Sequence, residues 1–307
     1  MSGERVGFVG LGRMGWPMAR NLARAGLELL VRDHNGELQE RFAVEHGATG
    51  AKSAADFAHC NLVVTMLPDD RAVREAVFHW DGGIAAALVP AAVVVDMSSS
   101  NPRGTRATGA ELDARGLSLV DAPVSGGVPR AEAGTLSIMA GADDPSALER
   151  ALPVLEVLGS RVFRTGPLGS GHAMKALNNY AGAAAYAAAA EALEIGRHYG
   201  LEAETIIEVI NASTGRSFNS EHVFGEHVLT GMYATGFALG LMAKDVAIAA
   251  DLAAASGVDT PVCRLVSERW AAARDGLGFD ADHSEAHKTW WADGTSALAD
   301  TMERNDT

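Results

Sequence analysis

One stretch near the amino terminus, residues 6–33, constrains the fold of this 307-residue chain more than any other. Val6-Gly-Phe-Val9 has the pattern of a short buried strand, and it ends in Gly10-Leu-Gly-Arg-Met-Gly15, a G-x-G-x-x-G motif. A helical pattern and a second strand pattern follow, and that strand ends at Asp33. Glycines with this spacing allow a tight turn, a close approach of a pyrophosphate to the backbone, and contact between helix and strand. The stretch therefore predicts a βαβ unit that binds a dinucleotide.

The acidic residue at the end of the second strand bears on the choice of coenzyme. A carboxylate at Asp33 can accept hydrogen bonds from both ribose hydroxyls, and it would repel a 2′-phosphate. The sequence therefore favours NAD, although the flanking Arg32 and His34 leave NADP possible. The predicted coenzyme contacts of this unit are Gly10, Leu11, Gly12, Arg13, Met14, Gly15 and Asp33.

Strand and helix patterns continue to alternate up to about residue 165. Ligands bind at the carboxyl ends of parallel strands, so Leu67, Pro68, Ser98 and Ser99, which follow two such strands, are expected to face the coenzyme. A later strand is followed by Ser125-Gly126-Gly127. Adjacent glycines leave backbone N–H groups open to a carboxylate, but an ordinary turn explains the same three residues equally well.

From residue 166 the strand patterns stop, and helices are predicted at about 168–198, 202–212, 219–229, 237–255 and 260–275. The sequence therefore predicts a dinucleotide-binding domain at 1–165 and a helical domain at 166–307. The first of these helices is alanine-rich and follows glycines at 166, 169 and 171. Lys175 and Asn179 lie one turn apart on the same face of that helix. Further along, Phe237, Leu241 and Lys244 also share a helical face.

Composition excludes several other classes of function. A net charge of −14 argues against nucleic acid and against anionic membrane surfaces as partners. The two cysteines lack metal-ligand spacing and indicate reduced thiols, and no signal peptide pattern is seen, so a cytoplasmic protein is expected. His283 and His287 have the spacing of a metal-binding pair, but no third ligand is evident, so no metal is predicted.

Four motifs in this order resemble the β-hydroxyacid dehydrogenase family, which includes 3-hydroxyisobutyrate dehydrogenase and tartronate semialdehyde reductase. The resemblance covers nearly the whole chain. It implies a Rossmann-type α/β domain followed by an all-α domain joined by a long helix, assembled as homodimers or homotetramers. The matching segments are Gly7–Leu22, Asp121–Gly127, Gly166–Asn179 with the pattern G-x-x-G-x-G-x-x-x-K-x-x-x-N, and Lys244-Asp245.

The resemblance also implies roles for individual residues. Lys175 would be the catalytic residue, Asn179 would bond the substrate, and Ser125, Gly126 and Gly127 would bind its carboxylate. Phe237, Lys244 and Asp245 would close over the substrate and the nicotinamide.

Four positions refine the comparison with relatives of this family. Lys175 argues against imine reductases, while the short chain and Asn178 argue against 6-phosphogluconate dehydrogenase. His172 stands where small residues are common in the family, and Ser99 stands where threonine is common. Both substitutions are expected to reshape the pocket, which leaves the identity of the acid and the role of His172 open.

The activity implied is hydride transfer between NAD(P) and a small 3-hydroxy acid such as 3-hydroxyisobutyrate or glycerate. Lys175 would act as general acid and base if burial lowers its pKa from about 10.4. Alternatively, a charged Lys175 would stabilise the developing alkoxide. Two other functions remain open: an NADPH-dependent semialdehyde reductase, and an inactive nucleotide-sensing or scaffold protein on the same fold.

Overall fold

The computed structural model describes residues 5–291 and divides into two compact units, Met1–Lys175 and Ala176–Thr307. The division falls inside one long helix, α8 (Ser170–Tyr199). The domain boundary predicted from the sequence, between residues 165 and 166, stays a prediction. All strands formed by the described residues belong to the first unit, and the second unit is helical.

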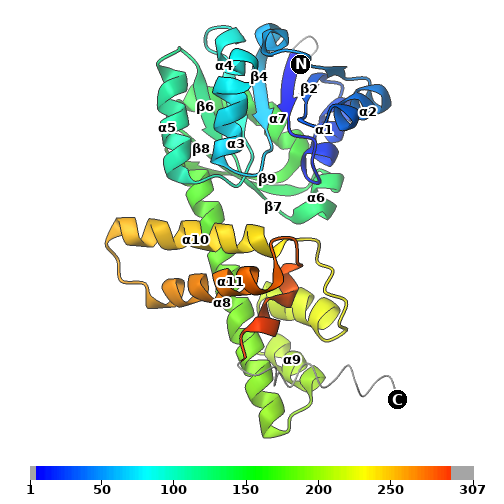
Figure 1. Ribbon diagram of the computed structural model, residues 1–307, viewed down its shortest axis with the longest axis vertical. Coiled ribbons are helices and arrows are strands. Elements are labelled where there is room, and N and C mark those ends of the chain that lie inside the picture. The colour runs from blue at the N-terminus through cyan, green and yellow to red at the C-terminus, as the bar shows by residue number, and fades with distance from the viewer. Residues whose placement is uncertain (1–4, 292–307) are drawn as a thin grey trace. The chain divides into compact units, whose positions relative to one another are not determined.

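The first unit is built on a nine-stranded sheet (Figure 1). Its strands pair in the order β3-β2-β1-β4-β5-β6-β8-β7, and β9 pairs with β8. The pairs from β3 to β6 are parallel, whereas β8 runs antiparallel to both β6 and β7. The strands are β1 (Arg5–Val9), β2 (Glu28–Arg32), β3 (Thr49–Gly50), β4 (Cys60–Thr65), β5 (Val93–Asp96), β6 (Ser118–Asp121), β7 (Val124–Ser125), β8 (Leu136–Ala142) and β9 (Gly159–Gly166).

This topology confirms the predicted Rossmann-type fold and places the carboxyl ends of β1, β4, β5 and β6 at one edge of the sheet. The direction of β8 was not evident from the sequence. Neither β3 nor β7 was predicted, because two residues carry no readable alternation. Since β7 follows β6 after only two residues and pairs with the same strand, β8, the pairing continues beyond the end of β6 toward the serine–glycine turn.

Each strand of the central sheet sends alternate side chains to opposite faces, and each face has its own core. Val64 of β4 packs in a cluster with residues of α1, α2, α6 and α7, whereas its neighbour Val63 packs with residues of η1, α3, η2, α4 and α5. The helical elements are α1 (Gly15–Arg24), α2 (Gly36–His46), η1 (Ala54–His59), α3 (Asp70–Arg74), η2 (Glu75–His79), η3 (Trp80–Gly82), α4 (Ile84–Ala87), α5 (Pro102–Asp113), α6 (Gly127–Ala133) and α7 (Pro145–Leu158).

The second unit consists of helices whose bounds follow the sequence-based expectation closely. Glycines in the left-handed region follow α8 and α10, at Gly200 (φ 97°) and Gly257 (φ 70°), and so end these helices. Pro261 begins α11, where its missing N–H costs nothing. The elements are the remainder of α8, α9 (Ala203–Ala212), η4 (Asn219–Val228), α10 (Leu239–Ser256), α11 (Pro261–Leu277) and η5 (His283–Thr289).

Aromatic side chains form the centre of the second unit. Tyr186 is fully buried and makes ring contacts with Phe224, Trp270 and Trp290. Two buried histidines, described below, lie against the same cluster.

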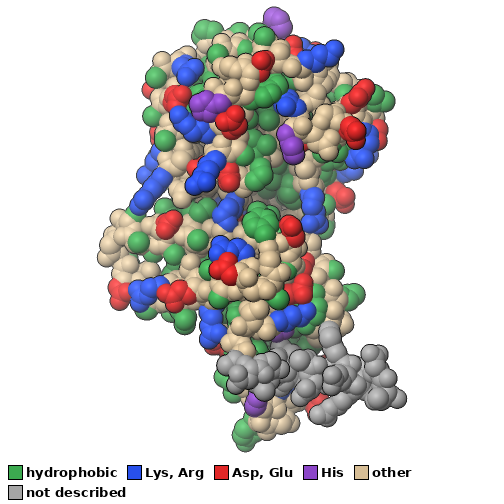
Figure 2. Space-filling view, in the orientation of Figure 1, with side chains coloured by type: hydrophobic (Ala, Val, Ile, Leu, Met, Phe, Trp, Pro, Cys, Tyr) green, Lys and Arg blue, Asp and Glu red, His purple; other side chains and the backbone are tan. Residues whose placement is uncertain are grey.

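Within residues 5–291, no helix combines the length and the apolar composition needed to cross a bilayer. Acidic and basic side chains are interspersed over the face shown in Figure 2.

Candidate active site

The three glycines of the loop between β1 and α1 have different surroundings. Gly10 has a φ of 100°, and a Cβ there would lie 2.2 Å from the Met66 carbonyl oxygen. A Cβ on Gly15 would lie 1.9 Å from the Gly10 carbonyl oxygen, so this glycine lets helix and loop touch. A Cβ on Gly12 would meet no atom within 4 Å. The loop is therefore closed at its two ends and open in the middle, which is where a pyrophosphate would approach the backbone.

The amino terminus of α1 suits the same ligand. The helix begins at Gly15 with no side-chain cap at Met14 and no acidic residue in its first turn. Unbonded N–H groups and the positive end of the helix dipole favour an anion there. The residues present thus fit the diphosphate of a dinucleotide.

Asp33 lies at the carboxyl end of β2 and is tied to the glycine loop. Its Oδ2 accepts a hydrogen bond from the Leu11 N–H at 2.7 Å, and its Oδ1 accepts one from the Asn35 N–H at 2.9 Å. The exposed His34 places its Nδ1 3.1 Å from the same Oδ1. Each carboxylate oxygen can accept a further hydrogen bond, so Asp33 retains acceptor capacity for ribose hydroxyls.

Arg32, which was expected to soften the preference for NAD, is held by other side chains. Its guanidinium carbon lies 4.6 Å from the centroid of the Trp80 ring, and its Nη1 donates to Gln39 Oε1 at 3.3 Å. Gln39 Oε1 also accepts from the Asp33 N–H at 3.0 Å. This arrangement holds Arg32 in a stacked position on Trp80.

The loops after β4 and β5 are linked to each other. Ser98 is buried, and its hydroxyl accepts a hydrogen bond from the Leu67 N–H at 2.9 Å. The Ser98 side chain therefore fixes the loop in which Leu67 lies. Pro68 is exposed and Ser99 is half-buried. Coenzyme contact by these four residues stays a prediction.

The serine–glycine turn lies beyond β6 and is open to solvent. Ser125 is half-buried, whereas Gly126 and Gly127 are exposed and have φ angles of 134° and 64°. Both angles lie in the region that favours glycine. Binding of a substrate carboxylate by this turn stays a prediction.

The first turn of α8 is anchored on the carboxyl end of β6. Asp121 Oδ1 accepts from the Gly169 N–H at 2.7 Å, and its Oδ2 accepts from the His172 N–H at 2.8 Å. A Cβ on Gly171 would lie 2.1 Å from the Met139 carbonyl oxygen, so only glycine fits there. Lys175, half-buried, follows His172 by three residues and lies on a neighbouring position of the same helical face. The helix that carries Lys175 therefore begins at the carboxyl edge of the sheet, where ligands of such folds bind.

The side chain of His172 is fully buried inside the first unit. Its expected effect on the shape of the substrate pocket stays a prediction. The ring lies between the carboxylates of Asp96 and Asp121, both of which are buried as well. Neither carboxylate was picked out as a site residue, although each ends an apolar strand pattern, which is the signal that could have identified it.

Asn179, Lys244 and Asp245 are close together in the second unit. Asn179 Nδ2 donates to Asp245 Oδ2 at 2.6 Å, and Lys244 Nζ lies 3.7 Å from Asp245 Oδ1. Phe237 is half-buried, and its ring contacts His283 edge-on at 5.7 Å between centroids. The structure thus brings together three of the residues that the resemblance singled out, through contacts between α8 and α10.

His283 and His287 are structural neighbours of the aromatic cluster. His283 Nδ1 lies 2.8 Å from Thr235 Oγ1, and His287 Nδ1 lies 2.8 Å from the Tyr186 hydroxyl. Burial lowers the pKa of both, that of His287 to about 4. Among residues 5–291, no three His, Cys, Asp or Glu side chains are grouped in a way that would hold a metal ion.

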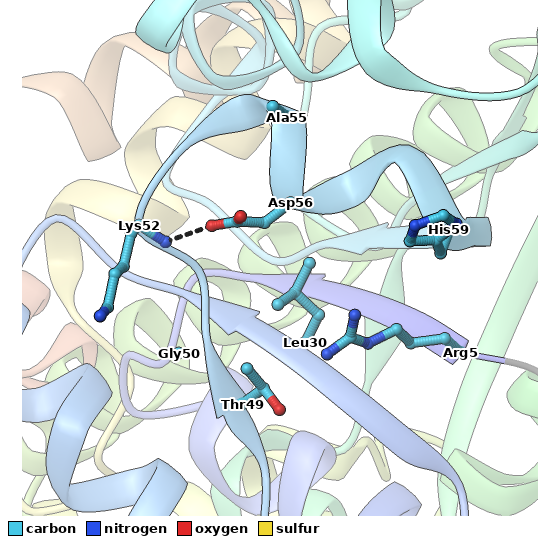
Figure 3. A pocket seen from close by; sticks show the side chains of 8 residues that line it. All are labelled: Arg5, Leu30, Thr49, Gly50, Lys52, Ala55, Asp56 and His59. Carbon is cyan, nitrogen blue, oxygen red and sulfur yellow. Dashed lines mark hydrogen bonds between the residues drawn. The ribbon is translucent and has the colours of Figure 1, made fainter.

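A separate cavity lies away from the glycine loop, at the amino end of β1. It has a volume of about 370 Å³ (Figure 3). Its lining combines side chains from the start of β1 with β3 and η1. Asp56 in this lining accepts from the Lys52 N–H at 2.7 Å, while the Lys52 side chain extends away from that carboxylate. Since ligands of such folds bind at the carboxyl ends of the strands, this cavity is not part of the candidate site. Its lining residues are Arg5, Leu30, Thr49, Gly50, Lys52, Ala55, Asp56 and His59.

Two family models together match nearly all of the described chain. The NAD-binding domain of 6-phosphogluconate dehydrogenase matches residues 5–166. The NAD-binding region of NADP-dependent 3-hydroxyisobutyrate dehydrogenase matches residues 169–290.

Individual proteins give the same picture. The 2-(hydroxymethyl)glutarate dehydrogenase of Eubacterium barkeri is 36% identical over 93% of this chain and 94% of its own. The NAD-dependent L-serine dehydrogenase of Pseudomonas aeruginosa is 37% identical over 85% of this chain and 89% of its own. The structure of Mycobacterium tuberculosis 3-hydroxyisobutyrate dehydrogenase with L-serine has a TM-score of 0.85 and 32% identity, covering 94% of this chain and 99% of that one.

Proposed function

Since the chain belongs to the β-hydroxyacid dehydrogenase family and is an NAD(P)-dependent hydroxyacid oxidoreductase, we propose that its substrate is a small 3-hydroxy acid and that Lys175 handles the proton. The observation that carries this proposal is the anchoring of the first turn of α8 by Asp121. That anchor starts the helix bearing Lys175 at the carboxyl edge of the sheet, where the glycine loop also ends.

The substrate class follows from what the relatives act on. 2-(Hydroxymethyl)glutarate, L-serine and 3-hydroxyisobutyrate share a primary alcohol whose neighbouring carbon bears a carboxylate. They differ in the third substituent on that carbon, which is a carboxyethyl group, an ammonium group or a methyl group. We propose that this chain recognises the shared unit through Ser125, Gly126 and Gly127, a turn whose two glycines are exposed and carry no side chain that would hinder a carboxylate.

In the proposed reaction, bound NAD(P) supplies the hydride acceptor or donor. During oxidation Lys175 takes the hydroxyl proton as the carbinol C–H bond breaks, so that an aldehyde acid forms. During reduction Lys175 returns the proton to the carbonyl oxygen. The same side chain, if it remains charged, stabilises the alkoxide that develops in either direction.

Further roles are proposed for four residues of the second unit. The amide nitrogen of Asn179 donates a hydrogen bond to Asp245, and this bond fixes the orientation of the Asn179 side chain. We assign Asn179 to the substrate, Phe237 to the substrate pocket, and Lys244 with Asp245 to the nicotinamide end of the coenzyme. Proximity of Lys244 and Asp245 supports a shared role.

Coenzyme preference is assigned to Asp33. Its carboxylate is held at the end of β2 by Leu11 and Asn35, and Arg32 is stacked on Trp80. A 2′-phosphate would therefore meet a fixed negative charge. We therefore propose NAD as the preferred coenzyme. We further propose that the chain forms a homodimer or homotetramer in the cytoplasm.

A substrate panel tests the proposal directly. Purified enzyme would be incubated with NAD, and separately with NADP, and with 3-hydroxyisobutyrate, glycerate, serine or larger 3-hydroxy acids, while reduced coenzyme is followed by absorbance. We expect turnover of at least one 3-hydroxy acid, faster with NAD. A chain that binds NAD but turns over no member of the panel in either direction would instead be a nucleotide-sensing or scaffold protein.

A further inference from the structure

His172 is a buried histidine that none of the proposed chemical steps uses. Its Nδ1 lies 2.8 Å from Thr105 Oγ1, and its Nε2 lies 3.0 Å from the Ser98 carbonyl oxygen. Its Nε2 also lies 3.6 Å from Asp96 Oδ2, and its Nδ1 lies 3.7 Å from Asp121 Oδ2. The ring therefore connects β5, β6 and α5 with the first turn of α8, all within the first unit.

The partners of the two ring nitrogens bear on where the hydrogens lie. A carbonyl oxygen only accepts, so the Nε2 that faces Ser98 O carries a hydrogen. The Thr105 hydroxyl lies 2.8 Å from Nδ1 and 3.1 Å from the Asn101 carbonyl oxygen, and it has one hydrogen to donate to either of them. When it donates to Asn101, its oxygen accepts from Nδ1, and both ring nitrogens are then donors, as in an imidazolium.

The two neighbouring carboxylates provide the matching negative charge. Asp96 accepts hydrogen bonds from the Thr65 hydroxyl, the Ser98 N–H and the Ser100 hydroxyl, at 2.9, 3.0 and 2.8 Å. Asp121 accepts two N–H groups of the α8 turn. Burial raises the pKa of Asp121, and His172 opposes that change. Two buried carboxylates this close to one ring need a cation, because an unpaired buried charge is costly.

We propose that His172 is a positioning residue, an imidazolium held between Asp96 and Asp121 that fixes the first turn of α8 and thereby places Lys175. The consequence for catalysis rests on the proposed role of Lys175. His172 and Lys175 are three residues apart on one helix, so a shift of the first turn displaces the lysine directly. Small displacements of a reacting group slow chemistry far more than they weaken ligand binding.

A pair of matched substitutions tests the effect on catalysis. His172→Gln removes the charge but retains hydrogen-bonding groups. His287→Gln is the control, because His287 is equally buried and also has its Nδ1 2.8 Å from a hydroxyl, yet its neighbours are aromatic rings. We expect His172→Gln to lower kcat on the order of 10- to 100-fold with the Kd for NAD unchanged, and His287→Gln to leave kcat unchanged. An unchanged kcat in His172→Gln would overturn the positioning role.

The charge state has its own test, which does not depend on activity. In ¹⁵N-histidine-labelled protein at pH 7, both ring nitrogens of His172 should show the chemical shifts of protonated nitrogen, whereas His287 should show one protonated and one unprotonated nitrogen. A neutral His172 ring would contradict the proposal even if Lys175 is catalytic. Conversely, a charged ring together with a fully active Lys175→Ala variant would overturn the proposed role of Lys175 while the charge assignment stands.

A charge-balancing variant covers the case in which His172→Gln does not fold. Asp96→Asn retains one acceptor oxygen, and its new amide can donate to the Ser100 hydroxyl. If His172 is charged, Asp96→Asn alone lowers the melting temperature of the wild-type protein, whereas it restores folding, or raises the melting temperature, when combined with His172→Gln. If the ring is neutral, Asp96→Asn relieves repulsion between two carboxylates and raises the melting temperature in both backgrounds, which would refute the proposal.

Discussion

The carboxyl edge of the sheet in the first unit and the aromatic centre of the second unit use polar residues in different ways. At the edge, glycines leave backbone groups open, and the buried side chains there are carboxylates held by N–H and hydroxyl donors. In the aromatic centre, Tyr186, His283 and His287 are buried beside rings. The Tyr186 hydroxyl is bonded to His287 Nδ1 and to a backbone carbonyl oxygen, and His283 Nδ1 is bonded to a threonine hydroxyl.

This difference separates residues that serve ligands from residues that serve stability. Ligands bind where backbone N–H groups are exposed and charged side chains are held in fixed positions. A polar group within an aromatic core chiefly satisfies its own hydrogen bonds. Substitutions of the open glycine and of the acid that faces the coenzyme should therefore change coenzyme binding with little loss of stability, and changes in the aromatic centre should do the opposite.

Among the effects that compare these two regions, the largest expected one is a loss of stability in acid caused by His287. Burial lowers its pKa to about 4 in the folded protein, against about 6.5 in an unfolded chain. The unfolded state therefore binds the proton more tightly, and stability falls as the pH drops from about 6.5 toward 4, by on the order of 3 kcal/mol in total. Denaturant unfolding at several pH values would measure this.

His287→Gln serves as the reference for that experiment, because glutamine does not titrate. The variant should be less stable at neutral pH, yet it should lose less stability than the wild type between pH 6.5 and 4. If the free energies of unfolding of the two proteins changed with pH in parallel, His287 would not be the titrating group, and its burial would not explain the loss of stability in acid.

A smaller effect is expected at the sheet edge, on coenzyme affinity. Valine at Gly12 would project into the space where a pyrophosphate approaches, since a Cβ there meets no atom within 4 Å. Gly12→Val should weaken NAD binding on the order of 100-fold with an unchanged melting temperature. Isothermal calorimetry and thermal unfolding would measure the two quantities.

Two other glycines provide controls for that variant. Gly225→Val in the second unit also adds a side chain in open space, and NAD affinity should not change. Gly15→Ala places a Cβ against the Gly10 carbonyl oxygen, so this variant should lose stability. If Gly12→Val bound NAD normally, the glycine loop would not be the coenzyme site.

The smallest of these effects concerns the choice between coenzymes. Asp33→Asn removes the fixed charge but retains an acceptor for the Leu11 N–H, so we expect the ratio of NADP to NAD affinity to rise about tenfold. Glu28→Gln, at the other end of β2 and largely exposed, makes the same change in net charge. An equal rise in both variants would indicate a general charge effect and not contact between Asp33 and the ribose.

How far the sequence predicts such a molecule depends on the range of the contacts involved. The glycine loop, the acid at the end of β2 and the helices of the second unit are all local patterns, and the sequence indicates them correctly. The inward orientation of Ser98 and the placement of His172 depend on partners dozens of residues away along the chain. Spacing and composition carry no information on such contacts.

The surroundings of His172 show most clearly what local reasoning misses, because helical spacing gives a face but not what that face contacts. The tight approach of Gly171 to β8 turns this face toward the sheet, and the ring is then enclosed by Asp96 and Asp121. The apolar patterns that end at these two aspartates were visible, but their pairing with His172 required the fold.

The proposed role of Lys175 is tested most directly by the variant Lys175→Ala. We expect kcat for the best 3-hydroxy acid to fall on the order of 10²- to 10⁴-fold, while the Kd for NAD is unchanged because the glycine loop is intact. Lys52→Ala, which removes an exposed lysine of the same unit, should keep full activity. Single-turnover formation of NADH would measure the chemical step. Turnover by Lys175→Ala close to that of the wild type would contradict the claim.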